Sequence, residues 1–151
     1  MSRPQTSRKV EPMKQACAIP DTHMDIVQSK ALACVAHKLP NGLLANNLVS
    51  FLWADDRFHF STLKSYHKYQ CLLADPCLTA LIVDPQDPRR YLELRGQAGL
   101  ADDVQRKFID SVAAKYFGLE HYPFDKPGDE RVTVTLELAR VRAVNLDAHD
   151  P

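Results

Sequence analysis

Residues 31–62 read ALACVAHKLPNGLLANNLVSFLWADDRFHFST and predict the first strands of the chain. The apolar run from Ala31 to Lys38 is typical of a strand. Pro40-Asn41-Gly42 follows it, and an Asn-Gly pair readily adopts the positive φ angles of a tight hairpin turn. The next apolar segment, from Leu43 to Trp53, therefore predicts the returning strand of a β-hairpin.

A third strand is expected directly afterwards. Ala54-Asp55-Asp56 predicts a turn, and polar and apolar residues alternate from residue 57 to residue 62. Phe58 and Phe60 should share one face of this strand, because successive side chains of a strand point to opposite sides. The stretch thus predicts three antiparallel strands in series.

Further strands are expected in the second half of the chain. Leu78 to Val83 is typical of a buried strand, and Arg90 to about Leu100 predicts a longer one that contains Gly96. A glycine inside a strand indicates a bulge or a close approach of another backbone. Alternation from Arg131 to Leu138, continuing to about Asn145, predicts the last strands.

Three segments carry apolar residues at helical spacing. The side chain of Asp21 or Thr22 is expected to cap the first helix, Asp75-Pro76 to end the second, and Gly118 to end the third. The expected bounds are Asp21 or Thr22 to Lys30, Ser65 to Asp75, and Asp102 or Asp103 to Gly118.

The order of these elements predicts six or seven mostly antiparallel strands and three helices. Too few strand-helix-strand units are present for a doubly wound sheet, so the expected class is α+β around a β-barrel. We expect one domain over residues 15–151, which suits a chain of 151 residues. Residues 1–14 are polar and lack periodicity, so we expect them to form a disordered tail.

Composition excludes several function classes. Nineteen basic residues balance nineteen acidic ones, so the broad positive field that attracts nucleic acid is missing. No apolar stretch approaches the roughly 20 residues that a membrane-spanning helix needs. The N-terminus has no apolar segment behind its basic residues, and we expect a cytoplasmic protein with neither nucleic acid nor membrane as partner. The four cysteines and six histidines show no metal-binding spacing, so we expect no metal.

A series of short motifs resembles the pyridoxamine 5′-phosphate oxidase-like split β-barrel family, and within it the branch that uses the deazaflavin coenzyme F420. The resemblance runs from about Ile19 to Val144 and depends on the order of the motifs. Those motifs are Pro40-Asn41-Gly42, Val49, Phe60-Ser61-Thr62, Lys68 with Leu72, Asp75-Pro76, Asp84-Pro85 and residues 90–96 (RYLELRG).

The resemblance implies a split β-barrel and a homodimer whose two clefts are lined by both subunits. It implies an oxidoreductase that transfers a hydride between reduced F420 and a small organic substrate, with the cofactor carrying the chemistry. An FMN-dependent oxidoreductase and a non-catalytic protein that binds a cofactor or tetrapyrrole are the alternatives. No catalytic residue is assigned, because the sequence contains no nucleophile and base at a recognisable spacing.

The resemblance also places a phosphate-binding segment from the end of the third strand into the second helix. Hydroxyl groups, cations and free N–H groups at a helix start are suitable ligands for a phosphate. The residues that it implies for cofactor binding are Val49, Ser50, Ser61, Thr62, Lys64, His67, Lys68 and Gln70.

The chain departs from the family pattern at positions where arginines are common. Tyr66, Gln70 and Cys77 occupy those positions here, and none of them can form the bidentate contact of a guanidinium with a phosphate. Lys68 is the cation of this segment that the chain retains, so we expect it to make a large share of the attraction for a phosphate.

Overall fold

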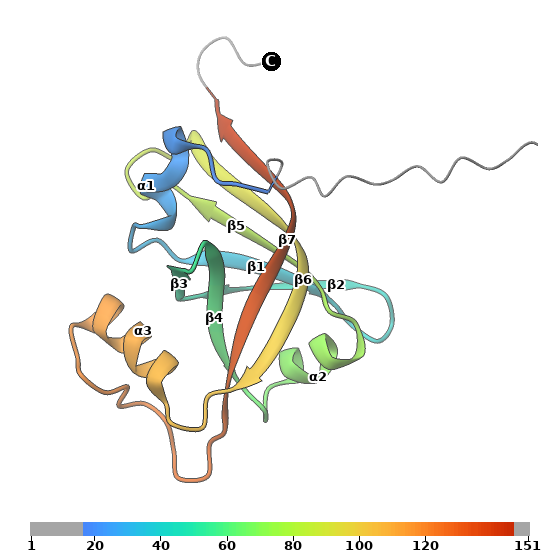
Figure 1. Ribbon diagram of the computed structural model, residues 1–151. Helices are drawn as coiled ribbons and strands as arrows, with labels where there is room; N and C mark the ends of the chain where they lie inside the picture. The colour runs from blue at the N-terminus through green and yellow to red at the C-terminus, as the bar shows by residue number, and fades with distance from the viewer. Residues whose placement is uncertain (1–16, 147–151) are drawn as a thin grey trace, which may run out of the picture.

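The computed structural model describes residues 17–146, which form one seven-stranded antiparallel sheet with helices around it (Figure 1). The predicted tail and both ends of the predicted domain lie outside the described residues. The sheet order is β2-β1-β5-β6-β7-β4-β3, which confirms the predicted α+β class. The strands are β1 (Ala33–Lys38), β2 (Leu44–Val49), β3 (Phe51–Ala54), β4 (Arg57–Leu63), β5 (Cys77–Val83), β6 (Arg90–Asp102) and β7 (Arg131–Asn145).

The predicted strand from Leu43 to Trp53 is wrong in one respect, because it is broken at Ser50 into β2 and β3. β2 pairs with β1, whereas β3 pairs with β4 at the other edge of the sheet. Val49 and Phe51 on either side of the break are both buried, so the apolar pattern continues while the pairing partner changes. Ser50 thus connects β2 at one edge of the sheet with β3 at the other edge, and we call this connection the seam.

The hairpin turns differ from the prediction in their backbone geometry. In the first turn Gly42 alone has a positive φ, of 84°, and its N–H donates to the Leu39 carbonyl at 2.9 Å. The predicted hairpin between β1 and β2 is confirmed, with its turn at Asn41-Gly42, but Asn41 does not have the positive φ that was expected of it. Two consecutive positive φ angles occur instead at Asp55 and Asp56, 53° and 56°, between β3 and β4. Aspartate tolerates this region because its short side chain is polar.

The core lies on the inner face of the sheet. Phe51, Phe58 and Phe60 are fully buried there, and the first two rings stack with centroids 5.2 Å apart. The long strands β6 and β7 pair through a register shift between Arg95 and Gly96, which confirms the predicted bulge. A Cβ atom on Gly96 would overlap the Glu137 carbonyl oxygen, so the predicted close approach is also present.

The helices are shorter than predicted at their starts or ends. α1 (Met24–Val27) follows a 3-10 turn at Asp21–His23 and ends before Lys30. Neither Asp21 nor Thr22 caps it, and the Thr22 hydroxyl shares a hydrogen bond with His23 Nδ1 instead. α2 (His67–Ala74) begins two residues after Ser65.

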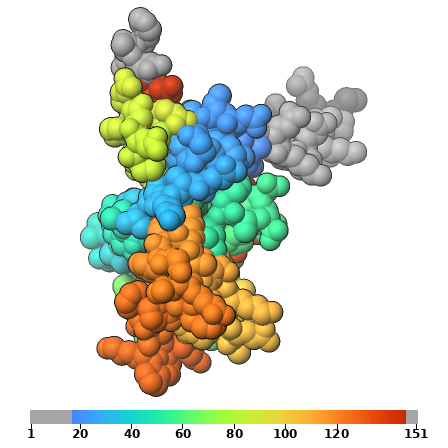
Figure 2. Space-filling model, turned by 90° about the vertical axis from the view of Figure 1, so that its left-hand side faces the viewer, coloured from blue at the N-terminus to red at the C-terminus, as the bar shows by residue number. Residues whose placement is uncertain are grey.

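α3 (Lys107–Phe117) begins later than the predicted Asp102 or Asp103. Arg106 directly before it has a positive φ of 59°, which interrupts helical geometry. The Asp103 carboxylate nevertheless accepts hydrogen bonds from the N–H groups of Phe108 and Ile109 at 3.2 and 3.0 Å. Gly118 ends the helix in the left-handed region, as predicted. Figure 2 shows α3 and the segment after it covering the lower part of one face, with α1 above them.

Candidate functional site

A cavity of about 220 Å³ opens where the seam of the sheet meets α2 and α3. Asn47 to Ser50 form the seam side, and Ser61 and Thr62 come from the end of β4. Tyr66 and Lys68 contribute from the start of α2. The remaining lining comes from α3 and the last part of the chain, with Ile109, Val112, Phe117, Tyr122 and Arg131.

The structure brings five of the eight predicted cofactor residues together at this cavity. They are Val49, Ser50, Ser61, Thr62 and Lys68. These residues come from β2, the seam, β4 and α2, so the curled sheet is what makes them neighbours.

The other three predicted residues lie elsewhere in the described chain. Lys64 lines a neighbouring hollow, where its ammonium pairs with Asp102 at 3.0 Å. His67 and Gln70 line a third hollow, of about 370 Å³, between α2 and the β1–β2 turn. Residues i and i+3 share a helix face, so His67 and Gln70 point one way while Lys68 points another.

Lys68 is a half-buried cation without a carboxylate partner among the described residues. Its ammonium lies 5.2 Å from the centroid of the Phe60 ring. Burial lowers the pKa of Lys68 to about 8, because removal from water disfavours the charged form. A negatively charged ligand group in the cavity would compensate this charge.

Thr62 is a second incompletely paired group on the same side of the cavity. Its side chain is 1% exposed, and its hydroxyl has no hydrogen-bond partner within residues 17–146. A buried unpaired hydroxyl costs free energy, and because protein atoms cover this oxygen a ligand reaches it only if the lining shifts. Ser61 beside it accepts a hydrogen bond from Arg131 at 3.4 Å.

Arg131 is a cavity residue that sequence reasoning did not single out. Its guanidinium donates to both carboxylate oxygens of Asp125, at 2.8 Å from Nε and 2.5 Å from Nη2. Asp125 also accepts from Arg106 at 2.9 Å, and the hydrogen bond from Arg131 lowers the pKa of Asp125. Arg131 lies over the Tyr122 ring at 4.9 Å. Its signal in the sequence is that it ends residues 127–131 (PGDER), a segment to which the family resemblance also extends, at the start of the last strand.

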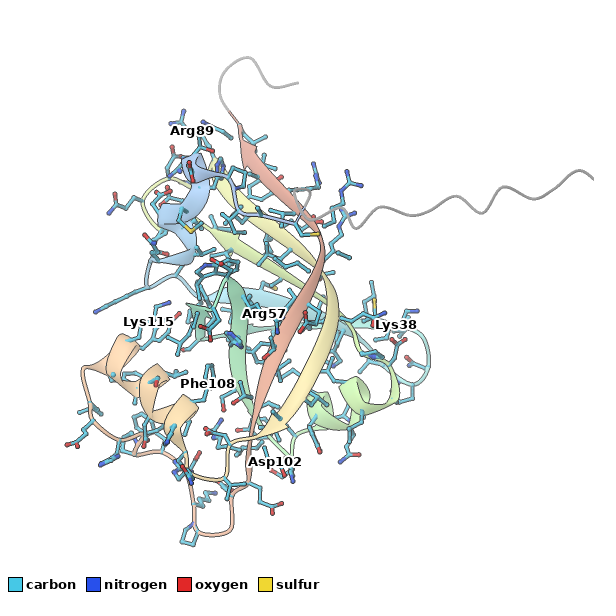
Figure 3. All side chains as sticks on the ribbon, viewed as in Figure 1. Lys38, Arg57, Arg89, Asp102, Phe108 and Lys115 are labelled. Carbon is cyan, nitrogen blue, oxygen red and sulfur yellow. The ribbon has the colours of Figure 1, made fainter. Side chains whose placement is uncertain are left out.

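The end of α3 holds the seam in place. The Tyr116 hydroxyl donates to the Ala31 carbonyl at 2.7 Å and accepts from the Phe51 N–H at 3.1 Å. The Lys115 ammonium donates to the Phe51 carbonyl at 2.9 Å, and burial lowers the pKa of Lys115 to about 8. Figure 3 shows Lys115 at the end of α3 beside β3, with Phe108 toward the other end. These contacts satisfy backbone groups at the edge strand where the cavity begins.

Other polar residues of the sheet have local partners outside the cavity. His59 bonds to the Thr135 hydroxyl at 2.8 Å and to the Ala54 carbonyl at 3.0 Å. Arg57 pairs with Glu137 at 3.0 Å, and Arg90 pairs with Asp25 and Asp84. These residues stabilise the surface of the fold.

The lining has the chemistry of a binding site. The cavity combines one uncompensated ammonium, an unpaired hydroxyl and aromatic rings, which suits a planar ligand with an anionic group. Within residues 17–146 no group of three or more His, Cys, Asp or Glu side chains is placed to hold a metal ion. No helix in the same range is long and apolar enough to cross a membrane.

Comparison with known proteins shows which fold this is. No protein-family model and no curated protein matches the sequence. Among solved structures, an F420 reductase matches with a TM-score of 0.73 and 22% identity, covering 82% of this chain and 98% of that one.

Two further structures show the range of proteins with this architecture. A Clostridium acetobutylicum protein related to general stress protein 26, of the pyridoxinephosphate oxidase family, matches with a TM-score of 0.61 and 17% identity, covering 85% of this chain and 92% of that one. A heme binding protein from Mycobacterium smegmatis matches with a TM-score of 0.58 and 20% identity, over 79% of this chain and 50% of that one. The chain has the split β-barrel fold of the pyridoxamine 5′-phosphate oxidase-like proteins.

Proposed function

We propose that the protein is an oxidoreductase that holds F420 in the cavity and passes a hydride between the reduced cofactor and a small organic substrate. The observation that supports this proposal best is the combination of Lys68 without a carboxylate partner and Thr62 with an unpaired hydroxyl. Both groups suit the phosphate of such a cofactor. When bound, the ring supplies the redox chemistry, and the chain's residues bind and orient it.

FMN is the second candidate cofactor. It also presents a planar ring and a phosphate, and a neighbour of the pyridoxinephosphate oxidase family shares the fold. A tetrapyrrole is less well supported, although a heme binding protein shares the fold. The described lining of the cavity contains no histidine, cysteine or methionine, so Tyr66 and Tyr122 are the lining residues of a type that can serve as an axial ligand of haem iron.

We also propose that the protein acts as a homodimer. The cavity of one chain, about 220 Å³, is smaller than the roughly 300–1,000 Å³ of typical ligand pockets. A second copy that contributed walls would complete a cleft for a ring cofactor. Light scattering at micromolar concentration should give about twice the 17.0 kDa chain mass. A monomer would contradict a shared cleft.

Hydride transfer tests the proposed activity directly. Reduced F420 and reduced FMN are each mixed with the protein and with quinone and enone acceptors, and reoxidation is followed by absorbance. We expect one cofactor to be reoxidised faster than in the protein-free control. If neither cofactor binds or turns over, the oxidoreductase proposal fails.

A pair of variants on β2 shows whether turnover depends on this cavity. Leu48 is exposed at the edge of the cavity, and Leu44 is exposed on the same strand outside it. Leu48→Trp should obstruct the cavity and reduce turnover strongly, whereas Leu44→Trp should leave turnover unchanged. Equal activity in both variants would place the reaction elsewhere.

A further inference from the structure

We infer that the cavity binds an oxyanion together with a proton, which is held at Lys68 Nζ. This inference rests on the proposed function, because it concerns how the same cavity takes the anionic group of its ligand. It adds a property of the binding step that the fold itself does not imply.

The surroundings of Lys68 are apolar or positively charged. The Phe60 ring lies 5.2 Å from the ammonium, and no carboxylate among residues 17–146 pairs with it. Arg131, the other cation that lines the cavity, pairs with Asp125, a carboxylate that it shares with Arg106. Lys68 is therefore the lining cation that has no carboxylate partner within residues 17–146, and its pKa falls to about 8 through burial.

One titratable group on a neighbouring strand interacts with Lys68. From β1, His37 is buried with its Nδ1 unpaired, and burial together with the charges of Lys68 and His67 lowers the pKa of His37. The lowered pKa favours the neutral form of His37. Tyr66 and Tyr122 line the same cavity.

The protonation state of Lys68 before and after binding determines how many protons are exchanged with the solution. Above pH 8 the free protein carries mainly the neutral amine, and the complex carries an ammonium paired with the anion. Binding then consumes one proton from solution and forms one N–H bond at Lys68. Below pH 8 the ammonium exists before the anion arrives, so little proton is consumed. The affinity for an anion should therefore fall about tenfold for each pH unit above 8.

Isothermal titration calorimetry with sulfate tests this inference, because sulfate keeps the same charge across the range. Titrations at pH 7 and pH 9, each in two buffers of different ionisation enthalpy, give the number of protons exchanged. We expect uptake of about 0.1 proton per sulfate at pH 7 and about 0.9 at pH 9. Absence of sulfate binding, or equal uptake at both pH values, would overturn the inference.

Two variants separate Lys68 from other sources of protons. Lys68→Arg keeps its charge at pH 9, so it should bind sulfate without proton uptake. Lys115→Met removes another lysine whose pKa is about 8 but which lies outside the cavity lining, and uptake should persist. Persistent uptake in Lys68→Arg would overturn the inference.

The outcome is separable from that of the proposed function. Proton-coupled sulfate binding without binding of F420 or FMN would leave this inference standing and remove the oxidoreductase. Cofactor binding without proton uptake at pH 9 would overturn this inference and leave the oxidoreductase proposal standing.

Discussion

The two sides of the cavity differ in how completely their polar groups are paired. On the α3 side, Asp125 pairs with both Arg131 and Arg106, and the Tyr116 hydroxyl bonds to backbone groups of Ala31 and Phe51. On the α2 side, Lys68 has no carboxylate partner within the described residues and the Thr62 hydroxyl is unpaired. We interpret the α3 side as the scaffold and the α2 side as the surface that contacts the ligand.

The largest expected effect is on the scaffold side. Arg131→Met leaves the buried Asp125 carboxylate with Arg106 alone, and both Arg131 and Asp125 side chains are only 8% exposed. Loss of one partner of such a pair should lower the free energy of unfolding by about 2–4 kcal/mol. Urea denaturation followed by circular dichroism measures this change.

Arg57→Met is the matched control for that variant. Arg57 pairs with Glu137 on the surface, where both side chains are more than half exposed. This variant should change the unfolding free energy by less than about 1 kcal/mol. Equal losses in the two variants would contradict the scaffold role of the Arg131 pair.

The next effect concerns the seam. Tyr116→Phe removes the hydroxyl that serves the Ala31 carbonyl and the Phe51 N–H, and should cost about 1–3 kcal/mol. Tyr91→Phe is the control, because the Tyr91 hydroxyl forms no hydrogen bond within residues 17–146. Thermal unfolding of both variants checks the difference. A Tyr116→Phe protein as stable as the control would show that these hydrogen bonds do not hold the seam.

On the α2 side of the cavity, substitution should lower the affinity for the cofactor without lowering the stability of the fold. Thr62→Val replaces a buried, unpaired hydroxyl with a methyl group of similar size, so stability should stay equal or rise. Affinity for the cofactor should fall about threefold to tenfold, because one hydrogen bond to the ligand is lost. A stability loss without a change in affinity would assign Thr62 to the scaffold.

The last expected effect is a pH dependence of stability. The pKa of Lys68 is about 8 in the folded chain and about 10.4 when unfolded. Between these values the unfolded chain binds more protons at Lys68, so this residue favours folding increasingly as the pH rises. The difference in unfolding free energy between wild type and Lys68→Met should therefore shift in favour of wild type from pH 7 to pH 10. A pH-independent difference would indicate a well-solvated Lys68.

Local patterns predicted most of the fold but not its closure. Alternation located the strands around Phe58 and Phe60, and Gly96 marked the bulge and the close approach correctly. The break at Ser50 could not be predicted, because Val49 and Phe51 remain buried on both sides while the pairing partner changes. Register across the sheet is a long-range property that a local pattern does not contain.

The part of the candidate site at the end of β4 and directly after it in sequence could be predicted. The part that depends on contacts between residues far apart in sequence could not. Ser61, Thr62 and Lys68 reach the cavity as expected from the phosphate-binding segment. Lys64 does not line the cavity, because its ammonium pairs with Asp102, which lies 38 residues away in sequence. Arg131 enters because β7 pairs with β4, with Arg131 opposite Leu63. Contacts of this kind require the topology of the sheet.

The most direct test of this account is the affinity for F420 and FMN, measured by fluorescence titration of wild type and two lysine variants at pH 7. Lys68→Met should weaken binding of the preferred cofactor by about tenfold to a hundredfold, because one charge-assisted hydrogen bond is lost. Lys64→Met should leave it unchanged, because Lys64 pairs with Asp102 outside the cavity. Equal affinities in the two variants, or no binding of either cofactor to wild type, would contradict a phosphate site at Lys68.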